Sequence, residues 1–253
     1  VLLSLGPLEI RWYGLVYALG FLIAAWWLKK YKEKVGLKKD EHWDLVFYAL
    51  VAGIIGARLF EVFWEPLYYL GNPLNMLKIW KGGMSFHGGF VGGTIGVWWF
   101  CKKKDLSFAK VLDLVTLPFM VALAFGRIAN FINGELWGRV SSSSWCVNFK
   151  NTGGGDVCRH PSTIYAAGKR FLILGWLYFL SSKDMFKPGF IVWNFVFWEG
   201  LGRIIVDFYR FEKTYYLGFT MGQILSLIMV LVALYAFWKY YRNDWKNLLG
   251  TSK

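Results

Sequence analysis

Seven stretches of the sequence are apolar over close to twenty residues each, and this feature restricts the chain more than any other. A helix of about 20 residues spans the roughly 30 Å hydrocarbon core of a bilayer. With 56% hydrophobic and 20% aromatic residues, the sequence has the composition of the membrane class. We therefore predict an all-α membrane protein with seven transmembrane helices, at residues 8–28, 43–64, 84–101, 111–131, 164–180, 189–208 and 217–238.

The positive charges between these stretches predict the orientation, because short loops rich in Lys and Arg stay on the cytoplasmic side. The predicted inner segments hold 16 Lys and Arg, and the predicted outer segments hold 7. The amino terminus is then outside and the carboxyl terminus inside. No basic segment precedes the first apolar stretch and no small-residue cleavage pattern follows it, so we expect a retained span. The net charge of +13 reflects orientation and contact with anionic membrane lipids, and we expect no nucleic-acid partner.

Two hydrophilic intervals stand out within what we otherwise expect to be a single polytopic membrane domain, residues 1–253. Residues 65–83 are broken by proline and glycine, and they predict a short outer interfacial arm. Residues 140–160 predict a small extracytoplasmic lobe with one hairpin. Cys146 and Cys158 lie in this lobe, where an oxidising environment favours a disulfide. The three cysteines include no Cys-x-x-Cys pair, so we expect no metal site.

Polar side chains inside the apolar stretches gather at one depth. In the predicted orientation, the outer part of a span contains each of Tyr13, Arg58, His87, Arg127, Asn130 and Arg203. Ionisable residues are costly inside a membrane and mark functional sites. Arginine is also favoured over lysine where phosphate is recognised through two parallel hydrogen bonds. The pattern predicts a site for an anionic lipid headgroup in the outer leaflet.

Structural interpretations of the same residues remain open. The arginines would be neutralised internally by the pairs Arg58 with Glu61, Arg203 with Asp207 and Arg127 with Glu135. His87 is either a hydrogen-bonded structural residue or a general base. An unperturbed imidazole pKa of about 6.5 suits removal of a proton from a thiol with a pKa of about 8.5.

Residues 126–139 carry the most specific motif, Gly-Arg-Ile-Ala-Asn-Phe-Ile-Asn-Gly-Glu-Leu-Trp-Gly-Arg. This segment resembles the signature of the prolipoprotein diacylglyceryl transferases. These bacterial membrane enzymes move diacylglyceryl from phosphatidylglycerol onto a lipoprotein cysteine. Further blocks match that family in its order, at residues 11–14, 56–58, 82–89, 159–162, 203–210 and 221–223.

The resemblance implies a seven-helix fold, an outer-leaflet active site in the bacterial cytoplasmic (inner) membrane, and a reaction without cofactor or metal. The expected partners are phosphatidylglycerol, a prolipoprotein signal peptide with its lipobox cysteine, and membrane lipids. The catalytic residues that we predict are His87, Arg127, Arg203, Glu135 and Tyr13. Phosphatidylglycerol would be bound by Arg127, Arg203, Asn130, Gly138 and Arg58. Supporting positions would be Asn133, Asp207, Arg139 and Tyr165.

The sequence departs from the family pattern in two places. We expect these departures to affect the handling of the peptide substrate and the reaction rate more than the type of reaction. Residues 163–166 read Thr-Ile-Tyr-Ala where the family usually has Gln-Leu-Tyr-Glu, and Asp207 stands where glutamate is usual. The alternative function is transport of an anionic lipid or solute at the outer leaflet. Seven spans cannot form two equal inverted halves, which weighs against a transporter.

Overall fold

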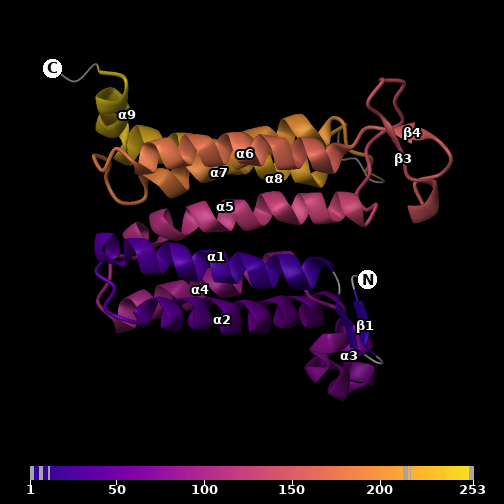
Figure 1. Ribbon diagram of the computed structural model, residues 1–253, viewed down its shortest axis with the longest axis horizontal. Helices are drawn as coiled ribbons and strands as arrows, with labels where there is room; N and C mark the ends of the chain where they lie inside the picture. The colour runs from indigo at the N-terminus through magenta and orange to yellow at the C-terminus, as the bar shows by residue number, and fades with distance from the viewer. Residues whose placement is uncertain (1–2, 6–7, 11, 213–215, 217, 251–253) are drawn as a thin grey trace. The chain divides into compact units, whose positions relative to one another are not determined.

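The computed structural model describes residues 3–5, 8–10, 12–212, 216 and 218–250, and this part of the chain is mostly helical (Figure 1). Its long helices are α1 (Trp12–Val35), α2 (Glu41–Trp64), α4 (Phe86–Lys103), α5 (Phe108–Ile132), α6 (Ser162–Ser181), α7 (Phe190–Asp207) and α8 (Met221–Tyr240). Each of them overlaps one predicted apolar stretch, so the prediction of a mostly helical fold is confirmed. Among the described residues, α2, α5 and α8 are long and apolar enough to cross a membrane on length and composition alone.

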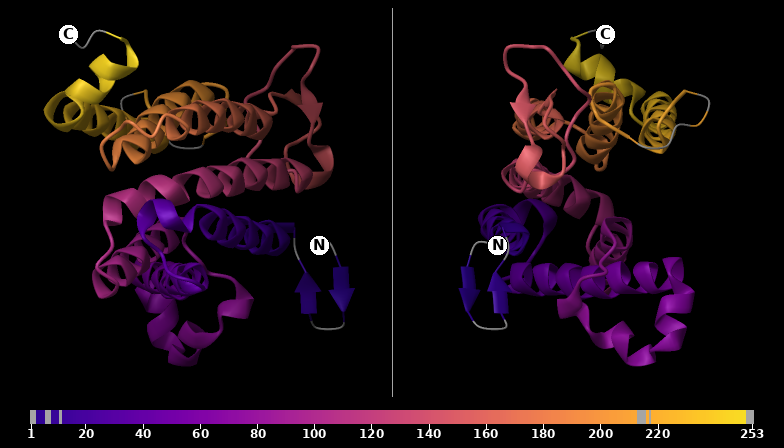
Figure 2. Two further views of the ribbon diagram at one scale, coloured as in Figure 1. Left: turned by 60° about the vertical axis from the view of Figure 1, so that its left-hand side comes forward. Right: turned by 90° about the vertical axis from the view of Figure 1, so that its right-hand side faces the viewer.

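The first predicted span is wrong at both of its ends. Leu8–Ile10 form strand β2, which pairs antiparallel with β1 (Leu3–Leu5), so the helix begins only at Trp12 (Figure 2). At its other end, α1 continues to Val35 through lysines that the charge pattern assigns to a connection. Lysine has a good helix propensity, so a helix does not have to end where its apolar residues end.

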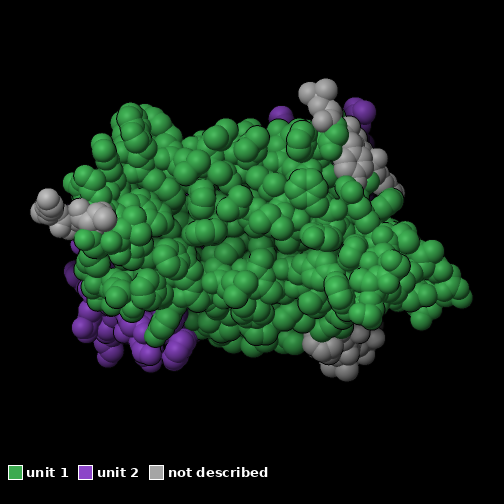
Figure 3. Space-filling view, turned by 90° about the horizontal axis from the view of Figure 1, so that it is seen from above, with its two compact units in different colours: residues 1–23, 115–253 green, residues 24–114 purple. Residues whose placement is uncertain are grey.

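The described chain divides into two compact units, coloured separately in Figure 3: unit 1 is residues 1–23 and 115–253, and unit 2 is residues 24–114. In unit 2, α2 and α4 pack closely along glycine faces. A Cβ placed on Gly56 would lie 2.8 Å from the Cα of Gly92, and one placed on Gly96 would lie 2.8 Å from the Cβ of Ala52. Glycine at every fourth residue of α4, at positions 88, 92 and 96, therefore lets the two backbones approach.

The predicted arm of unit 2 is a series of short helices: α3 (Pro66–Gly71), η1 (Pro73–Leu77) and η2 (Ile79–Lys81). Its apolar side chains are largely exposed, with Leu67 85% and Trp80 76% accessible. The segment is too short and irregular to cross a membrane. Its position at the membrane surface stays a prediction.

In unit 1, α6, α7 and α8 run side by side (Figure 1). One cluster of buried side chains joins α5, α6 and α7 through Met120, Leu177 and Phe195. A second cluster, around Phe190 and Phe237, is covered by α9 (Arg242–Leu248), a short helix that the sequence pattern does not predict. These two cores fix α7 between its neighbours, and α7 supplies much of the polar site described below.

The lobe of unit 1 contains a two-stranded hairpin of β3 (Val147–Asn148) and β4 (Cys158–Arg159), with the short helix η3 (Lys150–Thr152) between the strands (Figure 2). Cys146 and Cys158 form a disulfide, with their Cα atoms 5.4 Å apart. The predicted hairpin and the predicted disulfide are both confirmed.

Candidate active site

A polar pocket lies in unit 1, where the carboxyl-terminal ends of α5 and α7 meet the amino-terminal half of α6. Five of its lining side chains are cations and only two are carboxylates. The lining consists of Arg127, Leu136, Ser162, Thr163, Ala166, Lys169, Arg170, Glu199, Arg203, Val206, Asp207 and Arg210. Such an excess of positive charge among apolar helices suits an anionic ligand.

The signature segment forms one side of this pocket by ending α5 and turning back. Gly134 and Leu136 have positive φ angles of 68° and 54°, which reverse the chain just after Ile132. The Glu135 carboxylate then accepts hydrogen bonds from the side-chain amides of Asn130, at 3.1 Å, and Asn133, at 3.3 Å. Two amides therefore hold this carboxylate in place.

Arg127 does not form the ion pair with Glu135 that its spacing suggests. Within the described part of the chain, its guanidinium makes no hydrogen bond and no ion pair. Its electrostatic neighbours are mostly cations, Arg170, Arg203 and Arg210, with Glu199 as the partly offsetting carboxylate. The donors of Arg127 are thus available to a ligand in the pocket, and a bound anion would relieve the repulsion between the cations.

Arg203 does form the predicted pair with Asp207, but the contact is long. Its Nε lies 3.8 Å from Asp207 Oδ2, and its side chain remains 40% exposed. The buried Asp207 also accepts a 3.3 Å hydrogen bond from the hydroxyl of Thr220, the residue that caps α8. A Cβ on Gly222 would lie 2.5 Å from Asp207 Oδ2. The carboxylate is therefore fixed from two sides, while the Arg203 side chain stays partly accessible.

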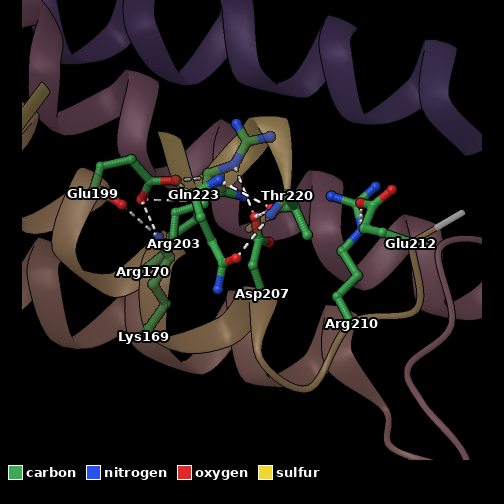
Figure 4. A network of polar contacts seen from close by, with 9 residues as sticks. All are labelled: Lys169, Arg170, Glu199, Arg203, Asp207, Arg210, Glu212, Thr220 and Gln223. Carbon is green, nitrogen blue, oxygen red and sulfur yellow. Dashed lines mark hydrogen bonds and ion pairs between the residues drawn. The ribbon is translucent and has the colours of Figure 1, made fainter. Parts of the chain in front are cut away.

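A buried ion triad forms the other side of the pocket (Figure 4). The Glu199 carboxylate on α7 accepts from Nε of Arg170, at 3.1 and 3.3 Å, and from its Nη2. Lys169 Nζ lies 2.9 Å from Glu199 Oε2 and donates to the Glu199 carbonyl oxygen at 3.0 Å. The predicted site does not include these three residues. Their charge within apolar stretches could have indicated these residues. Which of them pair with one another depends on how α6 packs against α7.

Gly138 and Arg139 join three separate segments of unit 1. The Gly138 amide donates to the His160 carbonyl oxygen at 3.0 Å, and the Arg139 amide donates to the Tyr209 carbonyl oxygen at 2.9 Å. A Cβ on Gly138 would lie 2.6 Å from that Tyr209 oxygen, so only glycine fits. Next to this junction, Arg210 Nε lies 2.9 Å from Glu212 Oε1.

Tyr165 connects α6 to the lobe. Its hydroxyl accepts a 2.7 Å hydrogen bond from the indole N–H of Trp145 and lies 3.1 Å from Nδ1 of His160. Its ring also contacts that of Tyr209 edge to face. Tyr165 therefore links α6 to the lobe and does not line the pocket, and its supporting role stays a prediction.

The contacts of Arg58, in unit 2, differ from both the predicted phosphate binding and the possible pair with Glu61. Its guanidinium donates to the carbonyl oxygens of Met76, Gly82, Gly83, Asn75 and Lys78 in the arm. These bonds use all five donors of an arginine. Among the described residues it forms no ion pair with Glu61, and its guanidinium carbon lies 5.0 Å from the centroid of the Tyr69 ring. Arg58 holds the arm and has no donor left for a phosphate.

The other two predicted catalytic residues lie elsewhere in the chain. His87 is exposed in the first turn of α4 in unit 2, where its ring lies near those of Phe60 and Phe86. Tyr13 lies in the first turn of α1, and its side chain is outside the described residues.

Apolar helices that are long enough to cross a bilayer, together with a largely buried pocket dominated by arginine and lysine, define a membrane protein with a site for an anionic ligand. Comparison with known proteins narrows this class. The sequence model of the family "Prolipoprotein diacylglyceryl transferase" matches residues 1–239. The chain belongs to this family of bacterial multi-pass membrane proteins.

Individual relatives support the same assignment over almost the whole chain. The phosphatidylglycerol–prolipoprotein diacylglyceryl transferase of Brucella anthropi is 37% identical over 270 residues, which cover 98% of this chain and 93% of that protein. The proteins of the same name from Brucella canis and Brucella ovis are each 36% identical over the same shares. The family resemblance seen in the sequence motifs is thereby confirmed.

Proposed function

We propose that this chain carries out the reaction for which its family is named, and that the pocket of unit 1 holds the phosphate of the lipid substrate. The reaction transfers the diacylglyceryl group of phosphatidylglycerol to the cysteine thiol of a prolipoprotein. The observation that carries the site is the position of Arg127, a guanidinium among other cations with no internal partner in the described part of the chain. An anionic phosphodiester supplies the missing charge.

The chemistry is a displacement at carbon. The cysteine thiolate attacks the glycerol carbon that bears the phosphate, so a C–S bond forms while the C–O bond to the phosphate breaks. The electron pair of the broken bond stays on the phosphate oxygen, and glycerol phosphate leaves. Arg127 and the accessible part of Arg203 would stabilise this growing negative charge. Fixed donors in a water-poor site contribute most to that stabilisation.

The surrounding residues position these two arginines. Asp207, held by Thr220, orients Arg203 from one side. Asn130 and Asn133 fix Glu135, which keeps the turn after α5 in place beside Arg127. Gly138 and Arg139 tie that turn to the segment that follows α7. We assign Asp207, Asn130, Asn133, Gly138 and Arg139 to support of the phosphate site rather than to chemistry.

The thiol proton needs an acceptor, and His87 remains our proposed base. The proposal rests on the imidazole, whose usual pKa is close to neutral. Glu135 is the second candidate, although its amide hydrogen bonds favour a positioning role. Tyr13 remains a proposed active-site residue from the sequence motif. Arg58 is removed from the phosphate site because its donors are all used within the arm.

We also propose the full arrangement in the membrane: seven spans, the amino end outside, and a site open to the outer leaflet of the cytoplasmic membrane. The excess of Lys and Arg in the predicted inner segments supports this orientation. The protein substrate would then meet the site through the signal peptide that carries its lipobox cysteine.

The test is direct. Purified protein is incubated with phosphatidylglycerol and a lipobox peptide, and the peptide is weighed by mass spectrometry. We expect the mass of one diacylglyceryl group to be added and glycerol phosphate to be released in equal amount. Lys183→Ala, in the loop between α6 and α7, is a matched control that should retain activity. Lipid movement across vesicles without any modified peptide would instead support the transporter.

A further inference from the structure

The charge of the pocket exceeds what the lipid substrate needs. The pairs Arg203 with Asp207 and Arg210 with Glu212 are neutral, whereas Arg127 contributes one positive charge. The triad of Lys169, Arg170 and Glu199 contributes a second, because one carboxylate binds two cations. Phosphatidylglycerol carries a single negative charge on its phosphodiester. A released phosphate monoester carries about −1.5 to −2 at neutral pH.

The site therefore matches the charge of the departing phosphate better than that of the bound substrate. Interactions that are stronger in the transition state than in the ground state accelerate the chemical step. The second positive charge would act mainly while the C–O bond breaks. The structure shows which member of the triad can deliver this charge to the ligand.

Each of the three guanidinium nitrogens of Arg170 already has an acceptor within the protein. Its Nε and Nη2 donate to Glu199, and its Nη1 donates to the carbonyl oxygen of Leu123 at 3.0 Å. It is 6% exposed. Lys169 is more accessible than Arg170, with 14% of its side chain exposed against 8%, and Glu199 takes two of its three ammonium donors, through Oε2 and the carbonyl oxygen. Within the described part of the chain, Lys169 thus has one donor without a partner, and it lines the pocket.

The packing of α6 against α7 also fixes the position of the Lys169 side chain. A Cβ on Gly202 would lie 2.7 Å from Lys169 Cδ, so the lysine stem crosses α7 over a glycine. Gly202 immediately precedes Arg203. The stem of Lys169 therefore passes beside the turn that carries a proposed phosphate-binding arginine, and Glu199 anchors its far end (Figure 4).

We infer that Lys169 is a third phosphate-contacting residue, whose ammonium binds the departing glycerol phosphate, and that Glu199 and Arg170 are positioning residues that hold it there. This inference rests on the proposed function of the pocket. In this arrangement, Arg127 and Arg203 bind the substrate phosphodiester, and Lys169 adds the contact that strengthens as the second charge develops.

The test compares Lys169→Met with Lys169→Arg and with the control Lys183→Met. Methionine removes the charge but keeps much of the stem, and it leaves the buried pair of Arg170 and Glu199 intact. We expect Lys169→Met to lower kcat about tenfold, to change KM for phosphatidylglycerol less than about threefold, and to weaken glycerol phosphate binding about tenfold. Lys169→Arg should recover part of each loss, and Lys183→Met should behave as the parent.

Glycerol phosphate binding, measured by isothermal titration without any turnover, separates this inference from the proposed function. Unchanged glycerol phosphate affinity in folded Lys169→Met would overturn the role of Lys169, even if activity fell. Transfer by the parent protein together with full activity of Lys169→Met would also overturn it, while leaving the proposed function standing. If the parent transferred no diacylglyceryl, the proposed function would fail, and a tenfold loss of glycerol phosphate binding would still support Lys169 as an anion ligand.

Discussion

The amide of Gly138 donates a 3.0 Å hydrogen bond to the carbonyl oxygen of His160, and the two residues lie so close that a Cβ on Gly138 would be 2.7 Å from the Cβ of His160. This contact ties the end of the signature segment to the residues that begin α6. It also holds together two segments whose neighbouring residues, Leu136 and Ser162, line the polar pocket of unit 1. The junction therefore depends on the absence of a side chain at position 138.

Gly138→Ala should destabilise the protein by about 1–3 kcal/mol, because the added methyl group overlaps backbone atoms that cannot move independently. Thermal or denaturant unfolding in detergent measures this change. Gly168→Ala is the matched control, since a Cβ at that position of α6 meets nothing within 4 Å. Equal stability of the two variants would contradict the close approach.

Replacing Arg127 or Arg203 with alanine should remove about 2–4 kcal/mol of transition-state stabilisation, or roughly 30- to 1000-fold in rate. Each Arg→Lys variant should recover only part of the loss, because lysine restores the charge without the two parallel donors. Steady-state transfer to a lipobox peptide measures both effects. Near-parental rates for both folded alanine variants would rule out the phosphate assignment.

Arg58→Ala should loosen the arm at residues 65–83 without a specific effect on phosphatidylglycerol binding, because the arginine binds only carbonyl oxygens of the arm. These bonds are part-buried, and leaving a buried acceptor unpaired costs about 1–3 kcal/mol, so we expect a loss at the lower end of that range. Limited proteolysis should cut the arm faster in Arg58→Ala, and also in Arg58→Lys, which lacks the five donors. A raised KM for the lipid with unchanged protection of the arm would return Arg58 to the phosphate site.

Reduction of the disulfide between Cys146 and Cys158 should destabilise the lobe by about 3 kcal/mol, because it releases a short closed loop. Hydrogen exchange of residues 145–160 before and after reduction measures this change. The double variant Cys146→Ser, Cys158→Ser should reproduce the reduced state and should not respond to reductant. Two titratable thiols in the lobe of protein prepared without reductant would exclude the bond.

Reporter cysteines at Lys34 and Asn151 should label from opposite sides of the membrane. Both positions are exposed, at the end of α1 and in the lobe. The natural cysteines do not interfere, because Cys101 is buried and the other two are bonded to each other. Labelling of both positions from the same side would overturn the proposed topology.

Much of this fold follows from local patterns in the sequence. The apolar stretches predict each long helix, because burial of a continuous apolar segment requires a helix that satisfies its own backbone hydrogen bonds. Glycine at every fourth residue of α4 predicts close packing, and two cysteines in a polar interval predict the disulfide. The errors occur at the ends of α1 and at α9, where charged and polar residues are compatible with helix, strand or loop.

The sequence alone also identified the family and singled out Arg127 and Arg203 as candidate phosphate ligands, because a short motif fixes residue type and spacing together. Only the tertiary structure decided how the charges pair. Glu199 binds Arg170, which is 29 residues away, and Arg58 binds carbonyl oxygens 17 to 25 residues away. Pairs at such separations form when helices pack or when a loop folds back over a side chain. The spacing of charges along a single helix does not contain that information.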